Sequence, residues 1–234
     1  STAYMPARST GGPIWSKTWP MWALNLMKYR KRAEYADGRE SSISGMEADD
    51  EYAPREHLRK VGSRIVMMAP VVHQLVGDEH VWDRIAIAQY RDRMAIIEMS
   101  SNADFQKDED HKEAGMDFTI VMATFPVEGD PVPPQESGAG DDRLMLLQVV
   151  GDADAPDIAA EIDSVRIGRF MIEDRFLGDD RTFAEARYDL VSRDAADELI
   201  ASGSTHSDTD YVVIADPALD DIARSLTDPS KVLF

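Results

Sequence analysis

Runs of apolar residues alternate with polar, helix-favouring stretches along the chain, and their order predicts a ferredoxin-like domain in the first half. Short runs rich in aliphatic and aromatic side chains are typical of strands, whereas longer stretches with apolar residues at helical spacing are typical of helices. The predicted order is a strand at 22–29, helical sequence at 44–60, strands at 63–77 and 81–91, helical sequence at 92–115 and a strand at 117–125. This β-α-β-β-α-β order defines the ferredoxin-like arrangement.

Three positions within these elements predict interruptions. Pro70 predicts a break in the strand at 63–77, because proline cannot donate to the hydrogen-bond ladder of a sheet. Ser100–Asn102 predicts a hinge in the helical sequence, and Gly115 predicts its end.

The same order follows in a shorter form after a Pro- and Gly-rich segment, which predicts a linker. Asp154 and Ser192 are the expected N-caps of two helices in this second half. The predicted elements are a strand at 143–151, a helix at 154–163, strands at 164–174 and 182–192, a helix at 192–203 and a strand at 210–217.

This duplication carries the prediction of the fold. A four-stranded antiparallel sheet with helices on one face leaves its other face to be covered. Two such sheets in one chain can cover each other, as two copies of one domain would in a homodimer. We therefore predict an α+β fold in which two tandem ferredoxin-like halves form a barrel within the chain. The predicted divisions are an extended N-terminal arm (1–18), a first ferredoxin-like domain (19–127), a linker (128–142), a second, degenerate ferredoxin-like domain (143–219) and a C-terminal tail (220–234).

Composition places the chain among globular proteins. It has 234 residues, of which 43% are hydrophobic and 29% charged, and this length suffices to bury a core. The chain contains no cysteine, which excludes thiol catalysis and Cys-based metal sites and fits a cytoplasmic location. No apolar run reaches the roughly 20 residues that span a bilayer, so no membrane partner is expected.

The charge is unevenly distributed. Residues 1–127 hold 16 Lys and Arg against 19 Asp and Glu, a net charge of −3, and residues 128–234 hold 9 against 25, a net charge of −16. An acidic second half repels a polyanion, so we expect no nucleic-acid partner.

The first half resembles a known family. The segments NLMKYRKRAEYADG, VWDRIAIAQYRDRMAIIEMSSNADFQ and HKEAGMDFTIVMATFP, in this order, are similar to the DUF1330 family over about residues 20–126. The resemblance implies a dimeric α+β barrel fold, and its wider superfamily includes cofactor-free monooxygenases, isomerases, haem enzymes and ligand binders. The chain departs from the family in its length, and Lys112 stands where the helix-end motif often has Arg.

The basic run at 28–32 follows an apolar strand, and alternation divides that strand between two faces. Ala23, Asn25 and Met27 share one face, and Leu24, Leu26 and Lys28 share the other. A buried amide needs hydrogen-bond partners, so Asn25 is a candidate to orient a ligand or to satisfy groups between the sheets. Lys28 is a candidate to meet an anionic substrate at the mouth of the barrel, or a solvated residue at the end of the strand.

His73 is the candidate catalytic residue, because an imidazole among apolar residues can act as a general base. The alternatives are a structural histidine bonded to the backbone and a haem ligand. Tyr90 and Arg169 are polar residues in strands and candidates for substrate binding. An inward Arg169 needs a carboxylate, either from a substrate or from Glu173 on the same face.

Two clusters combine histidine with carboxylates, but neither predicts a metal site. His111 and Glu113 lie on different faces of a helix. His206, Asp208 and Asp210 lie in a Ser- and Asp-rich stretch that is typical of a solvated turn. We expect no metal and no cofactor, and no common hydrolase, nucleotide-binding or zinc-protease motif occurs.

These observations lead to two hypotheses. The first is a cofactor-independent enzyme, of isomerase, lyase or monooxygenase type, acting on a small, mostly apolar organic molecule bound inside the barrel. The alternative is a non-catalytic protein that binds a small molecule or assembles as a homo-oligomer, with Trp15 and Trp19 of the N-terminal arm as contact residues.

Overall fold

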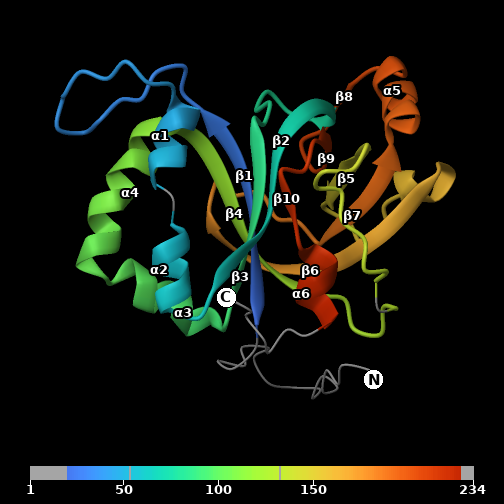
Figure 1. Ribbon diagram of the computed structural model, residues 1–234. Helices are drawn as coiled ribbons and strands as arrows, with labels where there is room; N and C mark the ends of the chain where they lie inside the picture. Colours follow the sequence, from blue (N-terminus) through green and yellow to red (C-terminus); the bar gives the residue numbers. More distant parts are fainter. Residues whose placement is uncertain (1–19, 53, 132, 228–234) are drawn as a thin grey trace.

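Eight strands of the computed structural model close into an antiparallel barrel (Figure 1). The structure describes residues 20–52, 54–131 and 133–227, so the predicted N-terminal arm lies outside the described residues. Two short strands, β8 (Thr205–His206) and β10 (Leu219–Asp220), pair with the side of β2. Around the barrel the order is β2 (Arg64–Gly77), β3 (Arg84–Tyr90), β1 (Met21–Tyr29), β4 (Met116–Pro126), β6 (Ser164–Leu177), β7 (Glu185–Ser192), β5 (Arg143–Val150) and β9 (Tyr211–Ala215), which returns to β2.

The first half confirms the predicted order of elements. Helices α1 (Gly45–Tyr52) and α2 (Arg55–Lys60) lie between β1 and β2, and α3 (Arg93–Ser100) and α4 (Ala103–Gly115) lie between β3 and β4. The hinge separates α3 from α4, and the Asn102 side chain caps α4 by accepting from the backbone N–H groups of Asp104 and Phe105.

The strand β2 runs through Pro70 without the predicted break. Residues 64–70 pair with β3, and beyond Pro70 the strand pairs with β9 instead. The Pro70 carbonyl accepts a hydrogen bond from Asp216 N at 2.9 Å. Proline therefore marks the point at which the strand passes from one half of the barrel to the other.

The second half has the predicted strand order but a different first connection. In place of the helix expected at 154–163 there is a single 3₁₀ turn, η1 (Ile158–Glu161). The carbonyl groups of Ala153, Ala155 and Pro156 accept hydrogen bonds from the Arg187 guanidinium, so they make no helical ladder. Helix α5 (Arg193–Ala201) is capped by Ser192 as predicted, and α6 (Ile222–Thr227) follows β10.

A continuous cluster of buried side chains fills the barrel interior. It takes residues from all eight barrel strands, among them Trp22, Leu24, Ile87, Phe170 and Tyr188, each at most 2% exposed. The Trp22 and Phe170 rings, one from each half, meet edge to face at 5.7 Å between centroids. This packing corrects the expectation that a ligand binds inside the barrel, because side chains occupy that space.

Helices cover the outer face of the barrel. The helices of the first half pack on β1 and β3 through a second buried cluster, which contains Met21, Ala23, Tyr52 and Phe105 (Figure 1). Both faces of these strands are therefore apolar. No helix in the described residues is long and apolar enough to cross a membrane.

Candidate functional site

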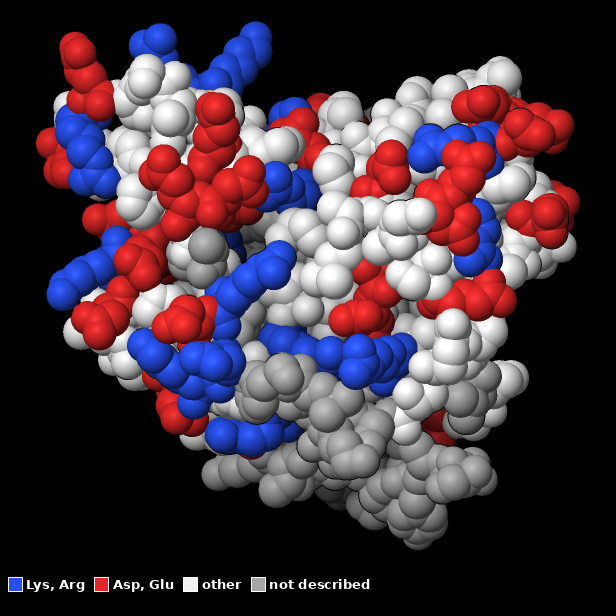
Figure 2. All heavy atoms as spheres, in the orientation of Figure 1, with Lys and Arg blue, Asp and Glu red and all other residues white. Residues whose placement is uncertain are grey.

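A cavity of about 190 Å³ lies between the helices of the first half and the outer face of the sheet. In the face shown by Figure 2, the surface is hollowed between these helices and the barrel. The apolar part of the wall comes mainly from the sheet. The lining side chains include Met27, Leu58, Ile65, Met68, Ala86, Ala88 and Met99, and the polar ones are Asn25, Asp49, Asp50, Tyr52, Arg55, Arg84, Tyr90 and Lys112.

Close contact between α1 and α4 builds one wall of the cavity. A Cβ atom added to Gly45, the first residue of α1, would lie 2.2 Å from the Gly115 carbonyl oxygen. Glycine at both positions therefore allows the backbones to touch. This contact brings Asp49 and Tyr52 of α1 and Lys112 of α4 to the same side of the cavity.

Asn25 lies in the cavity wall, on the helix side of β1. Its Nδ2 donates to the Ala23 carbonyl at 3.0 Å. The alternation of β1 was predicted correctly, because Leu24 and Leu26 lie in the barrel cluster on the other face. The expected position of Asn25 inside the barrel is corrected, since its face of the strand turns toward the helices.

An arginine and two aspartates form a charged group at one side of the cavity. Arg84 Nη1 lies 2.8 Å from Asp50 Oδ1 and 3.3 Å from Asp49 Oδ2, and the Arg84 and Asp49 side chains are each 9% exposed. The Tyr29 hydroxyl donates to Asp49 Oδ2 at 2.6 Å. Burial raises the pKa of Tyr29, and the neighbouring Asp49 carboxylate raises it further. Asp49 is thus engaged by donors from two strands.

Lys112 supplies the amine of the cavity. Its half-buried side chain lies with Nζ 5.6 Å from the centre of the Tyr52 ring. Burial lowers the pKa of the amine, against the opposing attraction of Asp49 and Glu109. Lys112 makes no hydrogen bond or ion pair with any other residue that the structure describes.

Two phenols complete the polar wall. Burial raises the pKa of Tyr90, and burial together with the nearby Tyr90 raises that of Tyr52. Both phenols therefore stay protonated at neutral pH and can donate a hydrogen bond. Within the described part of the chain, neither hydroxyl is engaged by another residue.

The other predicted site residues lie outside the cavity. His73 lies in the part of β2 that pairs with β9, and its Nε2 is 2.9 Å from Ser204 Oγ. Lys28 Nζ lies 3.1 Å from Asp83 Oδ1 at the end of β1. The structure therefore brings Asn25 and Tyr90 together and leaves His73 and Lys28 apart from them.

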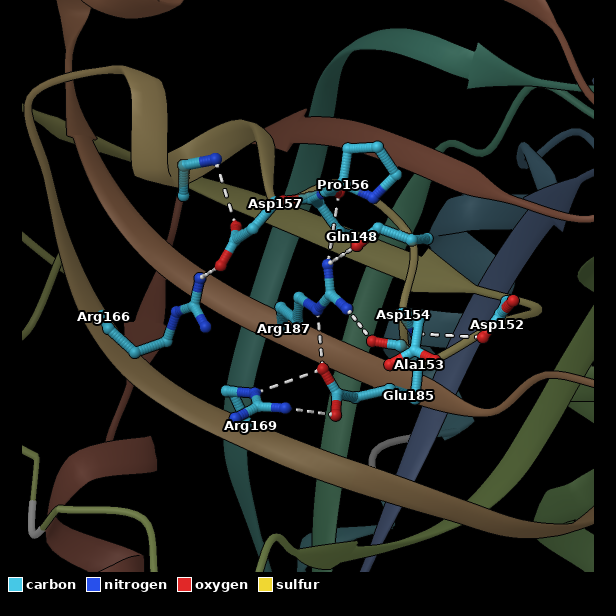
Figure 3. Close-up of polar contacts among 12 residues, drawn as sticks. Gln148, Asp152, Ala153, Asp154, Pro156, Asp157, Arg166, Arg169, Glu185 and Arg187 are labelled. Carbon is cyan, nitrogen blue, oxygen red and sulfur yellow. Dashed lines mark hydrogen bonds and ion pairs between the residues drawn. The ribbon is translucent and has the colours of Figure 1, made fainter.

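Arg169 belongs to a polar network on β6 and β7 (Figure 3). Its guanidinium contacts Glu185 Oε2 at 2.7 Å and Asp130 Oδ1 at 3.4 Å, so the expected pairing with Glu173 is corrected. Glu185 also accepts from Arg187 Nε at 2.6 Å. Adjacent strands, rather than alternate positions of one strand, supply the carboxylate that neutralises this arginine.

A cluster at the β2–β3 turn has the donor atoms of a metal site, but protein partners already engage it. Asp78, Glu79 and His80 bring carboxylate and imidazole atoms within 4.8 Å of one another. Asp78 accepts hydrogen bonds from Arg181 and from the His80 backbone N–H. Burial opposes ionisation of Asp78, but hydrogen bonds from His80 and Tyr211 and the charge of Arg181 outweigh it and hold its pKa low. The cluster is therefore explained as part of an ion-pair network.

Sequence reasoning missed most of the cavity's polar residues. Asp49, Tyr52 and Arg84 gave no signal beyond helix or strand composition. Lys112 was noticed only as a departure from a family motif. A lysine among carboxylates in a helix is usually solvated, and only the packing of α1 on α4 places this one at a cavity.

Comparisons with known proteins give partial likenesses and no family. No protein-family model matches the chain, and no curated protein matches it, so the resemblance to DUF1330 stays a prediction. A solved structure of RPA0582, a protein of unknown function from Rhodopseudomonas palustris, is 24% identical over 47% of this chain and 85% of its own, with a TM-score of 0.43. Its methylated form is 27% identical over 48% of this chain and 84% of its own, with a TM-score of 0.44.

Longer but weaker likenesses cover both halves of the barrel. A putative monooxygenase from Lactobacillus acidophilus NCFM is 11% identical over 86% of this chain and 94% of its own, with a TM-score of 0.41. A mutant chlorite dismutase from Candidatus Nitrospira defluvii is 11% identical over 92% of this chain and 97% of its own, with a TM-score of 0.45. Likenesses of this degree carry no argument about activity, which has to come from the cavity itself.

Proposed function

We propose that the chain is a cofactor-independent enzyme that acts on a small, mostly apolar organic molecule. The molecule is held in the cavity between the sheet and the first-half helices, with Lys112 as the reactive group. The observation that carries this proposal is a half-buried lysine without an ion-pair partner among the described residues, in the wall of a largely apolar cavity, where burial lowers the pKa of its amine. Amines in such surroundings can exchange protons or attack electrophiles near neutral pH.

The dimensions of the cavity limit the substrate. Sites for drug-sized ligands enclose about 300–1,000 Å³, and this cavity of about 190 Å³ is smaller. Its apolar wall favours an aliphatic or aromatic body. Asn25, Tyr52 and Tyr90 support binding of a polar end group, because each has hydrogen-bonding capacity at the cavity.

The proposal replaces the expected location inside the barrel and uses two of the expected residues. Asn25 and Tyr90 keep the substrate-binding roles predicted for them. His73, Lys28 and Arg169 are left out, because none of them lines the cavity. Cytoplasmic location and assembly through the N-terminal arm stay predictions.

Filling the cavity provides the test. Ala88 is half-buried in its wall, and Ala88→Phe places a ring in the space of the substrate. The matched control is Ala195→Phe, which changes a half-buried alanine of α5 in the second half. Saturation-transfer NMR with a panel of small ketones, carboxylates, alcohols and aromatics would measure binding to the full-length variants.

We expect the wild type and Ala195→Phe to bind the same panel members and Ala88→Phe to bind none of them. Following each bound compound over hours by NMR then separates turnover from binding alone, which is the alternative function. Binding that survives in a folded Ala88→Phe variant, or a wild type that binds no compound, would contradict the proposal.

A further inference from the structure

The surroundings of Lys112 distinguish it from the other described lysines. Lys28 is held in an ion pair, and Lys107, on the same helix, has a side chain that is 78% exposed. Lys112 faces the Tyr52 ring and the cavity and has no carboxylate within ion-pair distance among the described residues. Its amine therefore lies beside an aromatic ring and makes no salt bridge with the described residues.

Burial outweighs the charges around Lys112 and favours the neutral, nucleophilic form of its amine. Asp49 and Glu109 favour the protonated amine, but Asp49 is already engaged by Arg84 and Tyr29. A lysine becomes nucleophilic when desolvation lowers its pKa and frees the nitrogen lone pair. The titratable or charged side chains at the cavity or acting on Lys112 are Asp49, Asp50 and Tyr52 of α1, Arg55 of α2, Arg84 and Tyr90 of β3, and Glu109 of α4.

Resting on the proposed function, we propose that Lys112 attacks a carbonyl carbon and holds its substrate as an imine, so the substrate is a small aldehyde or ketone. The nitrogen lone pair forms the N–C bond, and the carbonyl π pair moves to oxygen. A proton passes from nitrogen to that oxygen, which gives a carbinolamine. The nitrogen lone pair then forms the C=N bond, and the C–O bond breaks. The hydroxyl takes up a proton and leaves as water, and the iminium nitrogen gives up its remaining proton, so amine and carbonyl become imine and water without any oxidant or reductant.

The remaining polar groups suit this chemistry. Tyr52 and Tyr90 are protonated phenols in the same wall, and a phenol that donates to the carbonyl oxygen stabilises the negative charge that develops there. The same cavity thus offers a nucleophile and hydrogen-bond donors for the carbonyl oxygen.

Reductive trapping tests this inference on the full chain. The protein is treated at neutral pH with benzaldehyde and sodium cyanoborohydride, which reduces an iminium to a stable secondary amine. Peptide mapping by mass spectrometry then measures labelling at Lys112 and at Lys107, the exposed control on the same helix. We expect Lys112 to be labelled faster than Lys107, because a lowered pKa leaves a larger fraction of its amine neutral at the pH of the experiment.

Two further measurements connect the reaction to the cavity. Ala88→Phe should remove labelling at Lys112 and leave Lys107 unchanged. Benzyl alcohol, which has the same ring without a carbonyl, should protect Lys112 in the wild type, so the result does not depend on folding of a variant. Labelling of Lys112 no faster than Lys107, or unaffected by both changes, would overturn the inference. If trapping at Lys112 fails but the wild type still binds compounds of the NMR panel, the proposed function stands and only the imine is excluded. If the wild type binds no compound of the panel, the proposed function and the imine are both excluded.

Discussion

Replacing Arg187 should destabilise the chain more than replacing any of its surface arginines. Arg187 is 3% exposed, and its guanidinium donates to Glu185 Oε1 at 2.6 Å and to the carbonyl oxygens of Ala153 at 2.7 Å, Ala155 at 2.9 Å and Pro156 at 3.2 Å (Figure 3). Arg187→Met keeps the apolar stem and removes all of these contacts.

The magnitude follows from the burial of the partners. Glu185 is 4% exposed and would keep only the Arg169 guanidinium, and the loop at 153–156 would lose its anchor. Because Glu185 keeps Arg169, the cost lies below the value for a charge left unpaired, and the lost charged hydrogen bonds are expected to cost about 2–3 kcal/mol. For a chain of this size, about 2–4 °C per kcal/mol converts this to a fall in Tm of roughly 4–12 °C.

Urea unfolding followed by circular dichroism measures the effect. Arg193→Met is the control, because Arg193 pairs with Asp142, whose side chain is 90% exposed, and solvent screens that pair. We expect the control to unfold at the wild-type urea concentration and Arg187→Met to unfold well below it, with an unchanged slope. An Arg187→Met variant as stable as the control would refute the assignment of this network as the anchor of the loop.

Three further changes test other parts of the account. Lys112→Met should be at least as stable as the wild type near pH 7, because the folded wild type pays to keep Lys112 protonated there. Wild-type stability rises with pH between the lowered pKa of folded Lys112 and about 10.4, the pKa of an unfolded lysine, and thermal melts of the variant at several pH values should lack that rise. Burial opposes ionisation of Glu185, but its two arginine partners outweigh this and hold its pKa low. Glu185→Gln should therefore lack the part of the wild-type stability that is lost as pH falls below about 4.3. Acid unfolding curves of the variant and the wild type that run parallel would contradict this. Gly45→Ala places a Cβ atom 2.2 Å from the Gly115 carbonyl oxygen and should destabilise the chain by about 1–3 kcal/mol in urea, and a variant of wild-type stability would exclude the close contact between α1 and α4.

The order of strands was predictable because each strand is a distinct apolar run. Which face of β1 points into the barrel was not predictable, because both faces of this strand are buried. Leu24 packs against the opposite half of the barrel, and Ala23 packs against helices. Alternation therefore assigned Asn25 to the correct set of residues but not to the correct side of the sheet.

The site depends on contacts between distant segments, which a sequence pattern does not contain. Lys112 becomes a cavity residue only because Gly45 and Gly115 allow two helices to touch. Arg169 finds Glu185 across a strand pair whose register is set by the barrel. The expected helix at 154–163 failed for the same reason, since Arg187 takes the carbonyl groups that a helix would have used.

The most direct test of the central claim is the pKa of Lys112, measured by an NMR pH titration of the full chain labelled with ¹³C at the lysine ε carbons. Lys112→Met assigns the signal. We predict that the signal absent from the variant titrates at a lower pH than the signals of the other lysines, and that benzyl alcohol shifts it. Titration of that signal together with the exposed lysines near pH 10.4 would contradict the assignment of Lys112 as the reactive group of the cavity.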